Sequence, residues 1–487
     1  MYKYNQNETP LFDALKEYVN RDTLPFHVPG HKKGKGMDEE FKDFMGDNPF
    51  KIDVTVFKLV DSLHHPNGPI KRSQELAADA YGSDACFFSI HGTSGAIQAM
   101  IMSAVSEGEK IIVPRNIHKS VTAGIILSGA IPVYMQPKLD KTLGIAHSVT
   151  PETVKETLEE NKDAKAVLII NPTYYGVATD IKKIADIVHS YGIPLIVDEA
   201  HGPHLKFNKK LPISAMDAGA DMAAQSTHKI IGALTQGSLL QVKEGYISVP
   251  RVKQVLSLLQ TTSPSYIVMA SLDCARRQIA TQGEQLLDNS IELSNYVRSE
   301  INKMPGLYCF GEEVLDGKGA YAFDPTKITI NCRDLGMTGY ELDSILADKY
   351  HIQMELSDLY NTLAVGSFGD TKEGMDRLLS ALKEISYEYY GEGQKRKADF
   401  LDIPEIPEQM LRPRKAFQSH TRIVKLEDSI GEISTEFLLA YPPGIPILCP
   451  GEKITKEIVD YVAELKRVGL YVQGTEDPKV DNIKVVE

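Results

Sequence analysis

A lysine and an aspartate are the two residues of this sequence best suited to act together in a chemical reaction. Asp198 ends the apolar run Pro194–Asp198, and Lys229, 31 residues later, follows the small and polar stretch Ala223–Thr227. A buried carboxylate needs a charged partner, because an unpaired buried charge is costly. A protonated pyridine nitrogen is such a partner, and a nearby lysine could bind the aldehyde of the same cofactor. The pair therefore predicts Schiff-base chemistry on pyridoxal 5'-phosphate, with Lys229 and Asp198 as catalytic residues.

Hydroxyl groups and small residues around this pair predict a phosphate site. The turn His91–Ala96 follows a predicted strand and opens a helix, where backbone N–H groups and the helix dipole favour an anion. The predicted phosphate ligands come from this turn and from the lysine segment: Thr93, Ser94, Ser226 and His228. Alone, such a turn is more often the plain start of a helix. Its place before the aspartate and the lysine favours the phosphate interpretation.

Two histidines could contact the cofactor. His118 follows the predicted strand Lys110–Pro114, and open α/β sheets bind ligands at the carboxyl ends of their strands. His118 could stack on the ring and present a nitrogen to the reacting carbon, as a further catalytic residue. A loop histidine without a ligand is the alternative. His201, three residues after Asp198, could bond near the phenolic oxygen of the cofactor or to the substrate carboxylate.

Short apolar runs alternate with helix-length stretches from about residue 85 to residue 242. The runs are Ala85–Ile90, Lys110–Pro114, Ile131–Met135, Ala166–Ile170, Pro194–Asp198 and Gly237–Val242. Strands that are apolar on both faces indicate a mostly parallel sheet with helices on both faces. The sequence therefore predicts an α/β protein.

The pattern changes after residue 315. Two strands and two helices are predicted there: Lys327–Cys332, Ile352–Leu356, Thr338–Lys349 and Thr371–Tyr390. Gly391–Lys397 is polar and reads as a linker. We therefore predict an N-terminal arm with a large cofactor-binding domain (1–315), a small α/β domain (316–392) and a C-terminal α+β domain (393–487).

Composition excludes several classes of function. The formal net charge of −13 argues against nucleic acid as a partner, because phosphate backbones need a basic field. The sequence contains neither GxGxxG nor a Walker motif. Its five cysteines show no CxxC pair and no metal spacing, which indicates free thiols in a reducing compartment. Without a signal peptide or an apolar run of roughly 20 residues, a cytoplasmic protein with no membrane partner is expected.

Taken together, these segments resemble the Orn/Lys/Arg decarboxylase family of pyridoxal-phosphate enzymes, and most closely its short biosynthetic arginine decarboxylases from Gram-positive bacteria. The stretches that carry the resemblance are Pro25–Gly34, Asp61–Ile70, Gln74–Gly95, Pro114–Ser120, Asn171–Tyr174, Val197–Gly202, Ser226–Lys229 and Tyr441–Glu452. The resemblance implies the aspartate-aminotransferase-like fold type I and a homodimer or larger homo-oligomer with active sites at the subunit interface. It assigns Lys229 to the Schiff base, Asp198 to the pyridine nitrogen and His118 to ring stacking. The large acid-inducible relatives carry an N-terminal wing domain that this sequence lacks, so their decameric assembly is not expected here.

The resemblance also implies a reaction, the decarboxylation of a basic L-amino acid. Arginine, converted to agmatine and CO₂ for polyamine biosynthesis, is the preferred substrate, with lysine (to cadaverine) and ornithine (to putrescine) as alternatives. A fold type I aminotransferase would usually clamp the substrate carboxylate with an arginine of the small domain, and Ala364–Asp370 contains none. A non-catalytic protein that binds the cofactor is the remaining alternative.

Two glutamates are the candidates for binding the cationic end of the substrate. A guanidinium favours a planar carboxylate, because two parallel hydrogen bonds can form. Glu355 lies on the predicted strand Ile352–Leu356, and Glu452 follows Pro450-Gly451. We expect at least one of them to contact substrate. A solvated or salt-bridged glutamate is the alternative for each.

Overall fold

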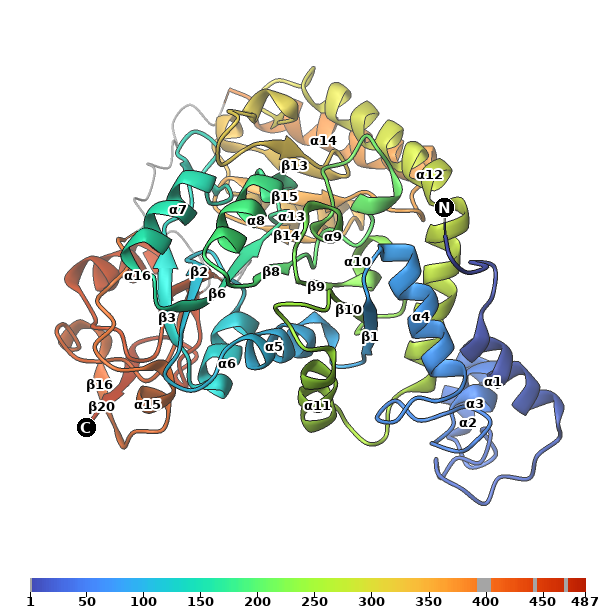
Figure 1. Ribbon diagram of the computed structural model, residues 1–487. Coiled ribbons are helices and arrows are strands. Elements are labelled where there is room, and N and C mark those ends of the chain that lie inside the picture. The colour runs from blue at the N-terminus through green and yellow to red at the C-terminus, as the bar shows by residue number, and fades with distance from the viewer. Residues whose placement is uncertain (1, 392–403, 441–444, 468–471) are drawn as a thin grey trace. The chain divides into compact units, whose positions relative to one another are not determined.

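The computed structural model describes residues 2–391, 404–440, 445–467 and 472–487 (Figure 1). Contacts divide the chain into two compact units, each built from two stretches of sequence. The first unit contains Met1–Ser103 and Ile196–Leu287, and the second contains Ala104–Leu195 and Asp288–Glu487. Among the described residues, no helix is long and apolar enough to cross a membrane.

Four strands of the first unit place the ends of several chain segments at one sheet edge. They are hydrogen-bonded in the order β1 (Ala85–Ser89), β10 (Ser238–Val242), β9 (Met222–Gln225) and β8 (Leu195–Asp198). Strands β8 and β9 are parallel, whereas β10 is antiparallel to both β9 and β1. The carboxyl ends of β1, β8 and β9 and the amino end of β10 therefore lie at the same edge.

Helices pack around these strands and enclose a buried core. They are α1 (Pro10–Asn20), α2 (Glu39–Met45), α3 (Asp47–Ile52), α4 (Pro69–Tyr81), α5 (Gly92–Ala104), α9 (Ala215–Ala218), α10 (Thr227–Ile230), α11 (Val249–Leu259) and α12 (Tyr266–Ile301). The core joins Leu11 and Leu15 of α1 to Phe88, Leu239 and Tyr266.

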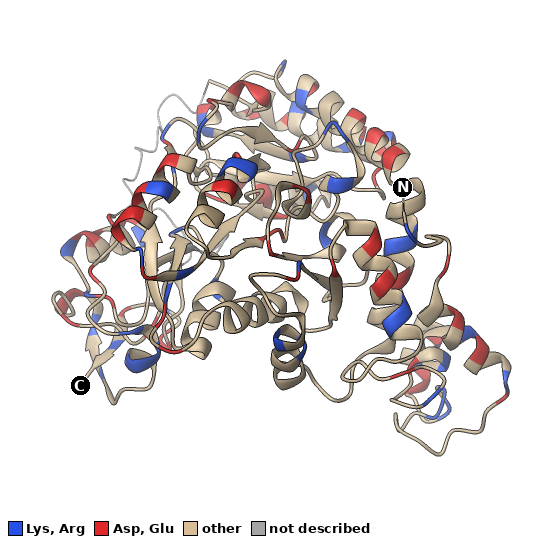
Figure 2. Ribbon diagram, viewed as in Figure 1, with Lys and Arg blue, Asp and Glu red and all other residues tan. Residues whose placement is uncertain are grey.

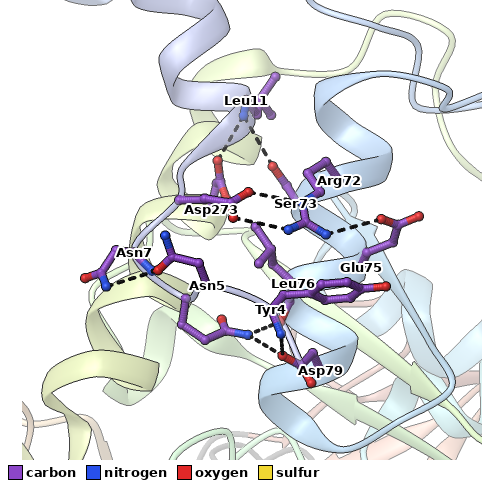
Figure 3. A network of polar contacts seen from close by, with 12 residues as sticks. Tyr4, Asn5, Asn7, Leu11, Arg72, Ser73, Glu75, Leu76, Asp79 and Asp273 are labelled. Carbon is purple, nitrogen blue, oxygen red and sulfur yellow. Dashed lines mark hydrogen bonds and ion pairs between the residues drawn. The ribbon is translucent and has the colours of Figure 1, made fainter. Parts of the chain in front are cut away.

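Polar contacts tie the N-terminal segment to α4 and α12 (Figure 3). The backbone N–H of Leu11 donates to Asp273 (3.0 Å) and to Ser73 (3.3 Å). Asp273 is also held by Arg276, in an ion pair whose two side chains are fully buried. The start of α1 is therefore fixed by groups that are more than 60 residues away in sequence.

Asp61 organises the loop that precedes α4. Its backbone lies in the left-handed region (φ 72°), and its carboxylate accepts hydrogen bonds from the backbone N–H groups of Ser62, Asn67, Gly68, Ile70 and Lys71. The N-terminal N–H groups of a helix have no partner within the helix. Asp61 accepts hydrogen bonds from two of these N–H groups at the start of α4. This buried carboxylate therefore fixes the loop to the first turn of the helix.

The second unit contains a parallel part of the sheet, in the order β6 (Ala164–Ile170), β2 (Lys110–Pro114) and β3 (Ile131–Met135). Three helices alternate with these strands: α6 (Lys119–Ser128), α7 (Pro151–Glu160) and α8 (Ile181–Ser190). All six strands predicted between residues 85 and 242, which lie in both units, are present within two residues of their predicted limits. Figure 2 shows acidic and basic residues interspersed on single helices such as α4 and α7.

A four-stranded antiparallel sheet follows, with strand order β11 (Tyr308–Cys309), β13 (Lys327–Asn331), β15 (Asn361–Val365) and β14 (Leu356–Ser357). It packs with α13 (Gly339–Tyr350) and α14 (Lys372–Tyr389), as predicted for a small α/β domain.

The predicted strand Ile352–Leu356 is wrong except at its last residue. His351 has a left-handed backbone (φ 54°) that ends α13, and pairing with β15 starts only when Glu355 N–H donates to Leu363 O (2.9 Å). The buried Met354 and Leu356 flank the exposed Glu355, which gives the alternating pattern of a strand. Met354 nevertheless lies outside the ladder with β15.

The C-terminal part is α+β, as predicted. Its elements are α15 (Pro413–Phe417), β16 (Thr421–Lys425), β17 (Leu438–Ala440), β18 (Ile445–Leu448), α16 (Lys456–Arg467), β19 (Val472–Gln473) and β20 (Asn482–Val486). They enclose a separate core that includes Leu438, Ile458 and Val485. The predicted boundary at 392/393, most of the predicted linker and residues 441–444 lie outside the described residues. The predicted domain limits stay predictions.

Candidate active site

Strands β8 and β9 place Asp198 and Lys229 at the same sheet edge. Asp198 is the last residue of β8 and lies opposite Ala224 of β9 in the parallel ladder. One residue beyond β9, Ser226 precedes the short helix α10, which carries the half-buried Lys229. The first unit therefore brings together the two residues on which the sequence prediction rests.

The charge of Asp198 is weakly compensated. The side chain is buried (5% exposed), and from the described residues it accepts a single hydrogen bond, from the backbone N–H of Ala200 (3.1 Å). Burial raises the pKa of Asp198 to about 6, opposed by that N–H and by the charge of Lys229. A protonated ring nitrogen would supply the charge and the donor that this site lacks.

Lys229 is already held by a neighbouring histidine. Its Nζ lies 2.7 Å from Nε2 of His201, a buried residue three positions after Asp198. An ammonium has only donors, so a protonated Lys229 donates to a neutral His201 at Nε2. The pair gives the lysine a fixed direction and an adjacent proton acceptor. The predicted contacts of His201 with cofactor or substrate stay predictions.

Three buried hydroxyl groups meet near the start of α5. Thr93 Oγ1 lies 2.5 Å from Ser226 Oγ and 2.8 Å from Ser238 Oγ. Among the described contacts, these two use two of the three hydroxyl hydrogens, so the third can donate to a ligand oxygen. Sequence reasoning missed Ser238, although its place at the amino end of β10, opposite Ser89 in the ladder, could have indicated it.

The other predicted phosphate ligands lie on the same segments. Ser94 is exposed on the first turn of α5. His228 is half-buried, and its Nδ1 lies 3.1 Å from the carbonyl of Gly237. Hydroxyl donors, a 13-residue helix that begins here, a lysine amine and an undercompensated carboxylate together fit the phosphate, aldehyde and ring nitrogen of pyridoxal phosphate.

Glu199 is a buried residue of this region that sequence reasoning missed. Its carboxyl accepts hydrogen bonds from Ala215 N (2.6 Å) and from the side chain of Gln225 (2.7 Å). Gln225 in turn accepts from Gln241 (3.1 Å). The buried side chains of Glu199, Gln225 and Gln241 therefore form one chain of hydrogen bonds. Burial raises the pKa of Glu199 to about 8, and its two hydrogen bonds oppose this rise. Gln225, a polar residue at the end of the small and buried strand β9, could have indicated a buried polar partner such as Glu199.

His118 lies at the end of the segment that follows β2, in the second unit. It occupies the N-cap position of α6, where Nδ1 accepts from the backbone N–H of Ser120 (3.2 Å) and lies 2.8 Å from its hydroxyl. The side chain is half-buried. Its role in ring stacking stays a prediction.

The two candidate glutamates differ sharply in environment. Glu355 is exposed and immediately precedes β14. Glu452 is fully buried, and both its oxygens are engaged by the guanidinium of Arg115, at 2.5 Å and 2.9 Å. One of them also accepts from Cys449 N (2.7 Å). Sequence reasoning gave Glu452 no partner, because Arg115 lies 337 residues earlier.

Comparisons with known proteins agree with this geometry. Residues 9–374 match the family model described as Orn/Lys/Arg decarboxylase, major domain, and residues 395–476 match Orn/Lys/Arg decarboxylase, C-terminal domain. The chain belongs to the Orn/Lys/Arg decarboxylase family, as its sequence pattern predicts.

Several relatives resemble the chain over its full length. It is 49% identical to an arginine decarboxylase of Bacillus anthracis (100% of this chain, 99% of the relative) and 47% identical to one of Bacillus subtilis (99% of each). The crystal structure of a Francisella novicida lysine decarboxylase matches 99% of this chain and 82% of its own, with a TM-score of 0.85 at 25% identity. The prediction of a fold type I decarboxylase is thereby confirmed at the level of family and fold.

Proposed function

We propose that this protein decarboxylates L-arginine to agmatine and CO₂ with pyridoxal 5'-phosphate as cofactor. One observation carries the proposal: a lysine amine, an undercompensated carboxylate and a set of hydroxyl groups converge at one sheet edge of the first unit. The choice of arginine is supported by 47–49% identity to proteins named arginine decarboxylase, against 25–27% for the lysine decarboxylases.

Bound pyridoxal phosphate supplies an aldehyde and an electron-withdrawing ring that stabilises the electron pair left on Cα when CO₂ departs. Lys229 provides the amine that would hold the aldehyde, and His201 Nε2, 2.7 Å away, can take up its proton. Asp198 would keep a proton on the ring nitrogen, while Thr93, Ser226 and the neighbouring Ser94 and His228 would bind the phosphate. We assign ring stacking to His118 from the family resemblance, and return of a proton to Cα to Lys229 or His118.

The cationic end of the substrate is better assigned to Glu355 than to Glu452. Both oxygens of Glu452 already bind Arg115, and the side chain is fully buried. Glu355 is exposed, and its backbone is fixed by the hydrogen bond to Leu363. We propose that Glu355 binds the guanidinium.

A substrate panel tests the proposal. Release of CO₂ should be fastest from arginine, slower from lysine and slowest or absent from ornithine. In Glu355→Gln, kcat/KM for arginine should fall roughly 10- to 100-fold, the equivalent of about 1.5–3 kcal/mol for a lost charge-assisted hydrogen bond. Glu373→Gln, at an exposed position of α14, is the matched control and should stay at the wild-type value.

Each outcome points to a different conclusion. If Glu355→Gln keeps wild-type kcat/KM, another residue reads the guanidinium and the decarboxylase proposal stands. A wild-type preference for lysine or ornithine would remove arginine as the substrate. No CO₂ from any of the three would reject the proposed function.

We also propose that the protein is a cytoplasmic homodimer or larger homo-oligomer and that its agmatine enters polyamine biosynthesis. The mass of the particle in solution tests the assembly.

A further inference from the structure

A buried ion pair joins the end of strand β2 to the C-terminal part of the second unit. Arg115, directly after β2, is 7% exposed, and Glu452 is fully buried. The guanidinium donates to both carboxylate oxygens of Glu452 and to the carbonyl of Ile447 (2.9 Å). Its face also lies over the ring of Tyr134, 4.7 Å from the centroid. Arg115 is therefore held on several sides.

A second arginine holds the other end of the same segment. Arg414 of α15 donates from Nε to the carbonyl of Ile126 (2.7 Å) and from its terminal nitrogen to the carbonyl of Leu127, in the last turn of α6. The last carbonyls of a helix have no partner within the helix and favour a cation. The C-terminal part thus contacts the segment 115–128 at its beginning and at its end.

The residues between Arg115 and His118 leave little freedom for this segment. Arg115 N–H donates to Met135 O (2.8 Å), Asn116 donates to His147 O (3.3 Å) and Ile117 is fully buried. His118 follows at once and caps α6. A displacement of Arg115 would therefore be passed along the backbone to His118.

We propose that Glu452 is a positioning residue, which fixes the segment carrying His118 through Arg115 and does not itself bind substrate. The inference rests on the proposed function, since it takes His118 as the histidine that stacks on the cofactor. Removing the charge of Glu452 leaves Arg115 buried without its ionic partner, which is costly. The segment then relaxes, and His118 loses its fixed place.

The test compares Glu452→Gln with Asp460→Asn, which breaks an exposed ion pair on α16 in the same C-terminal part. In Glu452→Gln, kcat for arginine should fall about 10- to 100-fold with KM within about twofold, because a misplacement of about 1 Å can cost 100-fold in rate. Hydrogen–deuterium exchange of residues 115–128 should rise, and β8 and β9 should exchange as in wild type. Asp460→Asn should change none of these.

A double variant, Arg115→Met with Glu452→Met, keeps the test decisive if Glu452→Gln does not fold. It removes both buried charges, a change that buried ion pairs often tolerate. It should fold and should show the same loss of kcat and the same rise in exchange at 115–128. Rescue of wild-type kcat in the double variant would show that the ion pair matters only for burying its charges.

Other outcomes overturn the inference. A higher KM for arginine with unchanged kcat and exchange would make Glu452 a substrate ligand. Unchanged kcat with raised exchange would make the ion pair purely structural. The exchange measurement needs no substrate, so a protein that releases no CO₂ from any amino acid would reject the proposed function, while the contact between Glu452 and the 115–128 segment is still measured.

Discussion

Strands β2 and β8 each end beside a buried carboxyl group, and the two groups are compensated very differently. Beside β2, Glu452 accepts two hydrogen bonds from Arg115 and one from a backbone N–H. At the end of β8, Asp198 accepts one hydrogen bond from the described residues. Burial raises the pKa of both groups. Burial alone therefore does not distinguish them, whereas the number of protein donors does.

The difference indicates where a ligand is needed. A buried carboxylate that forms a bidentate ion pair holds two parts of a protein together. One that keeps its charge with little help from the protein provides a place for the cationic group of a ligand. Asp61 supports the distinction, because it is also buried and accepts several backbone N–H groups of its own loop.

The largest effect should come from Lys229, the amine beside the undercompensated carboxylate. Lys229→Ala should lower kcat for arginine roughly 10⁴-fold or more, on the scale seen when a covalent nucleophile is removed. Borohydride reduction and peptide mapping should label Lys229 in wild type and no residue in the variant. Lys253→Ala, on an exposed face of α11, is the control. Labelling of another lysine in wild type would contradict the assignment.

Much of this site could be predicted because its chemistry lies in short segments. Parallel strands are buried on both faces, so β2, β6 and β8 show continuous apolar runs that locate their carboxyl ends. Asp198 is the last residue of β8, and Lys229 lies shortly after the end of the next strand, β9. The helices α13 and α14 lie within one residue of their predicted limits, because the threonine that caps each of them is also a local signal.

Contacts between distant segments could not be predicted in this way. The partner of Glu452 directly follows β2, and Glu199 is bonded by a side chain of β9, Gln225, which in turn accepts from Gln241 of β10. No local pattern encodes such pairs. The prediction of a strand at Ile352–Leu356 was wrong because apolar and polar residues also alternate where the chain approaches a sheet without pairing with it. Pairing with β15 begins only at Leu356.

The next effect concerns the charge of Asp198. Asp198→Asn keeps the shape but cannot hold a proton on a ring nitrogen. Turnover should fall about 10²- to 10³-fold, more than the ground-state value of one charge-assisted hydrogen bond (about 1.5–3 kcal/mol), because the charge acts during the reaction. Equilibrium dialysis should still show bound pyridoxal phosphate. Turnover within threefold of wild type in Asp198→Asn would remove this residue from its role and end the contrast with Glu452.

The smallest effect is expected at Glu199, the neighbour of Asp198, and it concerns stability. Burial raises the pKa of Glu199 from 4.5 to about 8. Between these values the unfolded chain has lost the proton and the folded protein keeps it, so stability falls as pH rises, by at most about 1.36 kcal/mol per pH unit. The groups that act on its charge are Asp217, which raises the pKa, and Lys206, which lowers it. Above pH 8 this contribution levels off.

Glu199→Gln isolates that titration, because glutamine has the shape of the neutral acid and no proton to lose. Relative to wild type, the variant should gain on the order of 2 kcal/mol in free energy of unfolding between pH 6.5 and pH 8.5. Urea unfolding at three pH values measures the gain, with the exposed Glu373→Gln as control. Turnover at pH 7 should stay within about threefold of wild type. An amide, like a neutral acid, has one acceptor oxygen and one donor group, and the side-chain amide of Gln225 can turn over to accept from that donor. A gain that does not depend on pH would mean that Glu199 is already ionised, and then both carboxyls after β8 would carry charge. A pH-dependent gain with normal turnover would show that Glu199 is the neutral one of the two adjacent carboxyls, beside the Asp198 that the proposed function requires to be ionised.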